Sequence, residues 1–128
     1  MGDPQIMSYI AGEAMTAPRG LPVKVSAART VVLCDSGASG EDSIGVINQD
    51  TDVANGGEVN VAVLGTPRQY KAGATITAGT HRFLMTETAT GRVIPATSGN
   101  EACAYFCGLQ DAADGDLVYA IPIRYQVP

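Results

Sequence analysis

Few residues of this 128-residue chain could carry out chemistry. The one histidine, His81, has no second histidine and no Cys-x-x-Cys pair at the spacing of a zinc site. A serine or cysteine triad would have to use His81 as its base, and no Gly-x-Ser-x-Gly motif is present to offer a serine. The sequence therefore predicts no metal site and no nucleophilic catalysis, and His81 is interpreted as a surface side chain.

The sharpest chemical motif is an aspartate that ends an apolar run, Val31-Val32-Leu33-Cys34-Asp35-Ser36-Gly37-Ala38. It resembles the Asp-Ser/Thr-Gly-Ala signature of retroviral-type dimeric aspartic proteases. The resemblance implies that Asp35 from two subunits would share one proton, because adjacent carboxylates cannot both ionise. Those enzymes also carry an apolar pair followed by a glycine and a short helix, and two segments of this chain could correspond to that feature. Residues 63–66 follow Asp35 too closely to leave room for the strands and flap between them. Residues 106–109 precede a hairpin turn instead of a helix. A hairpin loop is the favoured interpretation, and the protease is the alternative.

Two other groups of side chains could bind metals or form cross-links. Asp111, Asp114 and Asp116 could offer oxygens to calcium, but their spacing is not that of an EF-hand loop and the closing glutamate is missing. A solvated turn is expected there. The cysteines, an odd number without a Cys-x-x-Cys pair, predict reduced, buried thiols of a protein made in a cytoplasm; they are Cys34, Cys103 and Cys107.

Composition narrows the possible partners. The chain has 13 acidic and 8 basic residues, and the basic ones are scattered, so nucleic acid is not expected as a partner. No stretch approaches the roughly 20 apolar residues that cross a bilayer, and the first residues lack the pattern of a signal peptide. We therefore expect a soluble protein that is not secreted by that route and has no membrane partner.

The elements that would position these residues are short strands. From Val23 onward apolar residues recur at every second position between glycine and polar turns, which is the pattern of strands. Near the carboxyl end, the period of two runs from Leu117 to Val127, and Pro122 within it predicts an edge or a bulge. The prediction is an all-β fold, a small barrel or sandwich of about ten short strands, with residues 23–128 as a single domain. The predicted strands are 23–27, 30–34, 43–48, 58–64, 67–70, 74–77, 82–87, 92–95, 102–109 and 117–125.

Residues 1–22 are predicted to form an extended arm, because prolines and glycines interrupt them too often for a helix. Their apolar side chains gain little in water, so the arm should lie against its own domain or a partner. The residues expected to contact a partner or a neighbouring copy are Ile6, Met7, Tyr9, Ile10 and Met15.

One internal repeat is visible. Residues 45–50 followed by 57–61 reappear as residues 108–111 followed by 115–119. Each copy has a strand that ends in Gln-Asp, a glycine turn, an acidic residue and an alternating strand. Because two copies are too few for a solenoid, the repeat predicts two equivalent hairpins in one closed or nearly closed β domain.

From Gly45 to the carboxyl end, the chain resembles the capsid decoration, or cement, proteins of tailed bacteriophages. The resemblance lies in the order of short motifs, which are Ile44-Gly45-Val46, Gly57-Glu58-Val59-Asn60-Val61, Lys71 to Gly79, the hairpin Thr90-Gly91-Arg92-Val93, and the block Gly108 to Ile123. It covers about two thirds of the chain.

The resemblance implies a structural protein that is not an enzyme. Such a protein would bind the major capsid protein on the outer surface of an assembled virion head, would form a homotrimer, and would be made in the host cytoplasm. A module that binds only the expanded shell stabilises that shell by mass action, and many copies add their effects. The resemblance implies no cofactor, no metal and no small-molecule substrate.

Overall fold

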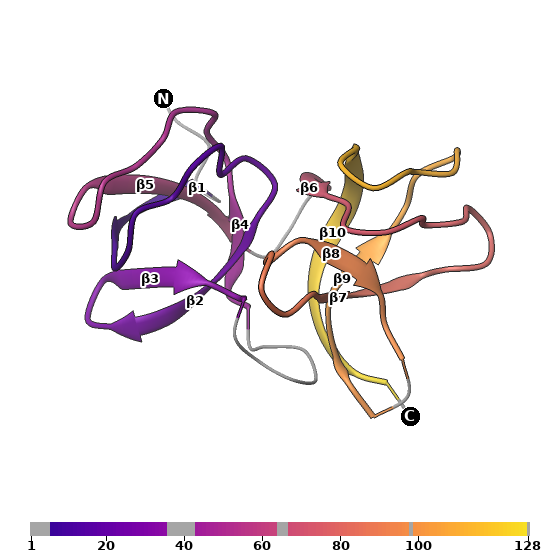
Figure 1. The fold of residues 1–128 in the computed structure, drawn as a ribbon. Helices are drawn as coiled ribbons and strands as arrows, with labels where there is room; N and C mark the ends of the chain where they lie inside the picture. The colour runs from indigo at the N-terminus through magenta and orange to yellow at the C-terminus, as the bar shows by residue number, and fades with distance from the viewer. Residues whose placement is uncertain (1–5, 36–42, 64–66, 98, 128) are drawn as a thin grey trace.

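The computed structural model describes residues 6–35, 43–63, 67–97 and 99–127. Within them the chain is all-β and forms ten strands, as predicted (Figure 1). None of the described residues lies in a helix that could cross a membrane. The strands are β1 (Ile6–Ala11), β2 (Pro22–Ala27), β3 (Thr30–Leu33), β4 (Gly45–Ile47), β5 (Glu58–Val63), β6 (Arg68–Lys71), β7 (Phe83–Thr86), β8 (Val93–Pro95), β9 (Glu101–Phe106) and β10 (Leu117–Gln126).

The first five strands close into a barrel in the order β1-β3-β2-β4-β5. We call it the N-terminal barrel. All of its strand pairs are antiparallel except β1 with β3, which is parallel. Alternation along the strands points one row of side chains into the barrel, where they form its core. This core consists of Ala11, Met15, Val23, Val31, Ile47, Val53, Val59 and Val61.

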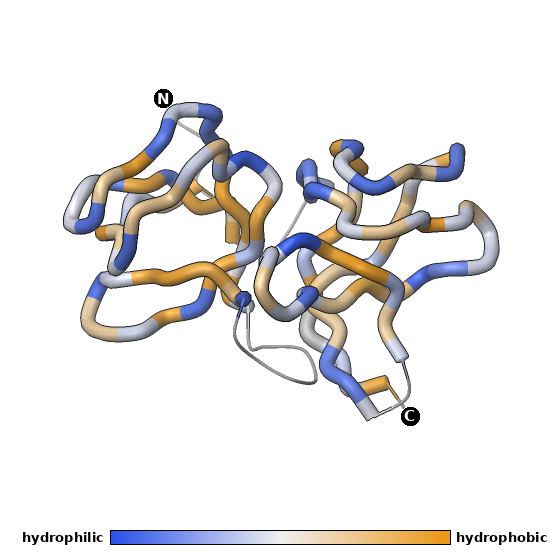
Figure 2. Tube along the Cα trace, viewed as in Figure 1, coloured by the Kyte–Doolittle hydropathy of each residue, from blue (hydrophilic) through white to orange (hydrophobic). Residues whose placement is uncertain are grey.

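The last five strands form a sheet in the order β6-β10-β9-β7-β8. A parallel bridge between Ala72 and Val93 brings the two ends of this sheet together, so the sheet is nearly closed. We call it the C-terminal barrel. Its core holds larger side chains, among them Tyr70, Leu84 and Phe106, together with several alanines. Figure 2 shows apolar stretches along the strands of both barrels.

The two barrels have one topology. Reading β6 to β10 as counterparts of β1 to β5, each antiparallel pair of the first barrel recurs in the second. The parallel pair of β1 and β3 recurs as the bridge between Ala72 and Val93. Tyr9, opposite Val59, corresponds to Tyr70, opposite Val118. The repeat therefore covers both barrels, but its register differs from the sequence alignment. Residues 57–61 correspond to 116–120, and the counterpart of β4 is β9, not residues 108–111.

The loops of the two barrels correspond to each other as the strands do. The bridge between Met15 and Val53 recurs as the bridge between Ile76 and Ala112. In the N-terminal barrel the amide of Ala17 donates to Asp52 Oδ1 at 2.9 Å. In the C-terminal barrel the amide of Ala78 donates to Asp111 Oδ1, also at 2.9 Å. Each turn is fixed by an aspartate in a loop distant in sequence, so both carboxylates have a structural role.

The barrels meet through the outer side of β4 and β5. Val46 and Ala62, a directly opposed pair, point away from the N-terminal core and join the core of the C-terminal barrel. The backbone also makes contact, because the Lys71 amide donates to the Gly20 carbonyl at 2.8 Å. Gly20 has φ +86°, and a Cβ there would lie 2.6 Å from the Lys71 nitrogen. This position at the joint therefore requires glycine.

Apart from differences of up to three residues at strand ends, the strand predictions differ from the structure in two places. Residues 74–77 form no strand, and only Ile76 makes a bridge there. Residues 6–11, placed in the expected arm, instead form β1, which pairs with β5 and β3. The expected break at Pro122 is present, since the register between β10 and β9 shifts between Pro122 and Tyr125. The predicted strand 102–109 ends at Phe106.

Candidate functional site

The residues that could do chemistry serve as structural groups. His81 Nδ1 accepts a hydrogen bond from the Thr77 amide at 2.9 Å, which fixes a turn of the C-terminal barrel. Asp114 forms an ion pair with Arg92 at 3.0 Å. Asp116 Oδ2 accepts from the Ala113 amide at 2.9 Å. The described residues contain no group of three or more His, Cys, Asp or Glu side chains that could hold a metal ion.

Asp35 follows β3 and lies beside the C-terminal barrel. Its carbonyl accepts a hydrogen bond from the Ala89 amide at 2.6 Å, and a Cβ at Gly91 would lie 3.5 Å from the Asp35 Cβ. The rest of the motif, residues 36–39, lies outside the described residues. No helix follows Phe106-Cys107-Gly108-Leu109. The structure gives no support to the protease alternative.

The three cysteines are thiols with different exposure. Cys34 and Cys103 are buried, and Cys107 is exposed, with its thiol 3.4 Å from the Tyr119 carbonyl. Complete burial raises the pKa of Cys103 to about 12. The prediction of buried thiols is confirmed for two of the three.

In the native protein we expect a disulfide reagent such as 5,5′-dithiobis(2-nitrobenzoate) to modify one thiol per chain rapidly at pH 8. The thiolate is the reactive form, and Cys103 is both inaccessible and held protonated by its raised pKa. Cys34 and Cys103 should react only after denaturation. Cys107→Ser should remove the fast reaction, and a fast reaction that persists in this variant would show that a barrel core opens readily.

The five residues expected at a capsid or neighbour contact do not form one patch. Ile6 packs against the joint between the barrels, and Met15 is 1% exposed in the N-terminal core. Tyr9 is partly buried against the same core, with its hydroxyl 3.9 Å from Met7 Sδ. Met7 and Ile10 are exposed, at 48% and 40%. Of this set, only these two residues offer substantial apolar surface.

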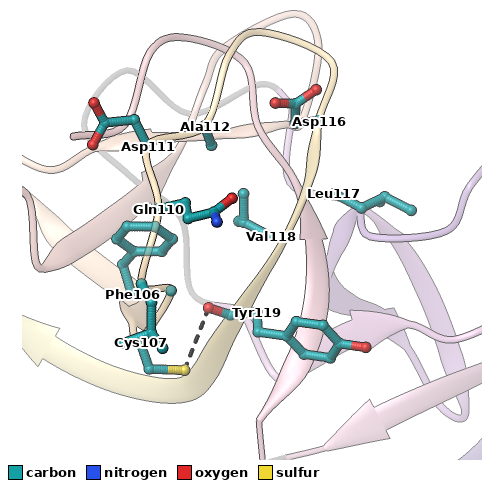
Figure 3. Close-up of a pocket in the computed structure, with 11 residues that line it drawn as sticks. Phe106, Cys107, Gln110, Asp111, Ala112, Asp116, Leu117, Val118 and Tyr119 are labelled. Atoms are coloured by element: carbon teal, nitrogen blue, oxygen red, sulfur yellow. Dashed lines mark hydrogen bonds between the residues drawn. The ribbon is translucent and has the colours of Figure 1, made fainter. Parts of the chain in front are cut away.

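A groove that the sequence did not reveal lies at the hairpin between β9 and β10 (Figure 3). Its volume is about 570 Å³, and it is lined by residues 106–112 and 116–119. Leu109, in this loop, is 96% exposed, so it is an apolar side chain almost fully in water. The sequence placed Leu109 at the end of a strand, and the glycine before it was the signal that the strand ends earlier.

The outer face of the C-terminal barrel carries an apolar row. Phe83, Tyr105 and Ile121 lie side by side on β7, β9 and β10, because Tyr105 is opposite both of the others. The Phe83 and Tyr105 rings meet edge to face at 5.5 Å, and Tyr125, 41% exposed, stacks on Phe83 at 4.7 Å. We call these four residues the aromatic row. The signal for it was the unusually long run of large apolar residues at alternate positions of β10.

Comparison with known proteins finds a similar fold in a solved structure but no similar sequence. No protein-family model and no curated protein sequence matches the chain. Among solved structures, the N base of the head fiber gp8.5 of bacteriophage phi29 is similar, with a TM-score of 0.63 and 22% sequence identity. The likeness covers 96% of this chain and 97% of that chain. Both barrels therefore have counterparts in that structure, which confirms the all-β fold.

Proposed function

We propose that this chain is a structural, non-enzymatic protein of a bacteriophage virion that binds the outer surface of the head and stabilises the expanded shell. The observation that carries the proposal is the fold, which matches the base of a head fiber over almost the full length of both chains. The proposed partners are the major capsid protein and further copies of the chain, which we expect to form a homotrimer.

Binding alone is sufficient to stabilise a shell. A protein that binds the expanded shell and not its dissociated subunits lowers the free energy of the expanded state by an amount that grows with its concentration over Kd. A homotrimer that contacts several subunits gains avidity, because its second and third contacts form at a high effective concentration. This mechanism needs no catalytic group.

The groove between β9 and β10 is the proposed contact with the shell. Leu109 is 96% exposed, and its neighbours Leu117 and Tyr119 are 43% and 57% exposed. Burial of a leucine side chain is worth about 1.5–3 kcal/mol. A contact that buries Leu109 would thus contribute about tenfold to a hundredfold in affinity per copy. Met7 at the N-terminal barrel is a second apolar residue that the shell could cover.

Heads prepared without the protein provide the main test. The purified full-length chain should sediment with these heads up to a fixed ratio, and the loaded heads should release DNA at a higher temperature than bare heads. No co-sedimentation would refute head binding. Co-sedimentation with an unchanged release temperature would refute stabilisation and would favour a role as the base of an appendage.

Leu109→Asp should weaken co-sedimentation at least about tenfold, because it removes an apolar contact and places a charge in the interface. Val25→Asp is the matched control. Val25 is 52% exposed, but it lies on β2 of the N-terminal barrel, away from the groove. If both variants bind heads as the parent protein does, the groove is not the contact with the shell.

A further inference from the structure

The joint between the two barrels buries a specific row of the N-terminal barrel. This row consists of Pro22, Val46 and Ala62, which lie side by side because Val46 is opposite both of the others. All three are buried, although Val46 and Ala62 point away from their own core. Val46 and Ala62 are buried because they join the core of the C-terminal barrel. Figure 1 shows β4 on the side that faces that barrel. We call this set the joint row.

The aromatic row is the counterpart of the joint row. Tyr105 is opposite Phe83 and Ile121 just as Val46 is opposite Pro22 and Ala62. The same positions of the repeated fold are thus covered by a neighbouring barrel in one half of the chain. In the other half they lie at the surface, where Phe83, Tyr105 and Ile121 are only partly buried.

The outward side chains of β10 also differ in kind from those of β5. Glu58 and Asn60 of β5 correspond to Leu117 and Tyr119 of β10, because each pair faces corresponding residues of β1 and β6. These outward positions are thus polar in the first barrel and apolar in the second. In a chain of net charge −5, an apolar aromatic surface of this kind is a candidate for a protein contact.

The surface onto which the joint row packs also has a counterpart. Within the chain, Val46 and Ala62 of the joint row share a core cluster with Tyr70 of β6. The Lys71 amide of the same strand also donates to the Gly20 carbonyl of the N-terminal barrel. The counterpart of β6 is β1, and Ile10 stands where Lys71 stands. Ile10 is 40% exposed, so this strand offers an apolar side chain.

We propose that the aromatic row docks on β1 around Ile10 of a second copy of this chain, so that the contact between chains reuses the surfaces that join the two barrels within a chain. The contact is head-to-tail, because it uses a different surface on each copy, and such contacts close into rings or continue as chains. The proposal names the interface of the homotrimer proposed above. It rests on the proposed function only for the number of copies in the assembly.

Cross-linking tests the contact directly. In a Cys107→Ser background, which removes the exposed thiol, one chain carries Ile10→Cys and another carries Tyr105→Cys. Oxidation of the mixture should give a covalent dimer, whereas either variant alone should stay monomeric on a denaturing gel. The experiment is run with the free protein and with protein bound to heads. A dimer from either variant alone would show a symmetric contact, and no dimer from the mixture in either setting would refute the proposal.

Sedimentation equilibrium supplies the second measurement. Tyr105→Glu should weaken self-association by about tenfold or more, as loss of an aromatic residue at the centre of an interface does. Ile10→Glu should weaken it similarly, and the control Val25→Glu should leave it unchanged. Unfolding midpoints of the variants confirm that they fold.

Self-association that is equal in all variants would overturn the proposed interface. Co-sedimentation with heads, measured on the same variants, separates this result from a failure of head binding. Variants that bind heads but do not associate would leave the proposed function standing. Association without head binding would support this interface and refute the function.

Discussion

Gly45→Ala is expected to prevent the N-terminal barrel from closing normally. Gly45 lies on β4 between β2 and β5, and a Cβ there would be 2.3 Å from the backbone oxygen of Ala62. That atom belongs to the paired strand, so the clash can be relieved only by moving β5. We expect a loss of about 3 kcal/mol or more in the free energy of unfolding, a large part of the roughly 5–15 kcal/mol that holds a domain together.

Urea unfolding followed by circular dichroism measures this loss, and Gly56→Ala is the matched control. Gly56 has φ +88°, but a Cβ there would meet no atom within 4 Å, so this substitution strains only the backbone, by about 1 kcal/mol. The counterpart of Gly45 is Ala104, which carries a Cβ between the corresponding strands. An equal cost for the two substitutions would show that β4 and β5 can move apart enough to accommodate a Cβ at Gly45.

Tyr70→Ala is expected to be the most damaging substitution in the C-terminal barrel. Tyr70 is fully buried, and its core cluster also contains Val46 and Ala62 of the other barrel. The cavity left by an aromatic side chain typically costs about 3–5 kcal/mol. Because the side chain lies where the barrels meet, both barrels should unfold in one transition, and the midpoint of that transition should move to a lower urea concentration. Separate transitions, with the N-terminal barrel unchanged, would contradict this expectation.

Tyr70→Phe is the matched variant and should be neutral or stabilising. The Tyr70 hydroxyl is buried and has no hydrogen-bond partner among the described residues, so its removal relieves a desolvation cost. Burial also raises the pKa of Tyr70 well above its ordinary value of 10.0. Because the folded pKa is above the unfolded one, stability is complete below pH 10 and falls as the pH rises beyond it. Tyr70→Phe should make this alkaline fall shallower, and an unchanged slope would contradict the assignment.

Most of the strands could be predicted because alternation of apolar residues is a local signal. Val59 and Val61, for example, point into one core, with exposed Asn60 between them. β1 escaped prediction because its side chains do not alternate cleanly. Ile6 is covered by the other barrel, whereas Met7 lies on the side of the core but is half exposed. The strand exists because β3 and β5 supply hydrogen-bond partners, which no local pattern records.

The division into two barrels was not predicted either. The hairpin repeat was visible, but closure depends on which strands pair, and the bridge from Ala72 to Val93 joins residues whose local sequence gives no sign of it.

Surface residues were the hardest to predict. Met15 looks like an exposed residue of an arm in the sequence, yet the bridge with Val53 holds it in the core. Whether an apolar residue of a strand is covered depends on the neighbouring barrel.

The difference in size between the joint row and the aromatic row has a thermodynamic meaning. β5 ends at Val63 and β6 begins at Arg68, so the two barrels of one molecule are tethered closely and meet as if at millimolar concentration. Small side chains such as Pro22, Val46 and Ala62 suffice for a contact that forms under those conditions. Separate molecules in dilute solution lack a tether, and a face made of Phe83, Tyr105 and Ile121 has the additional apolar area that untethered association requires.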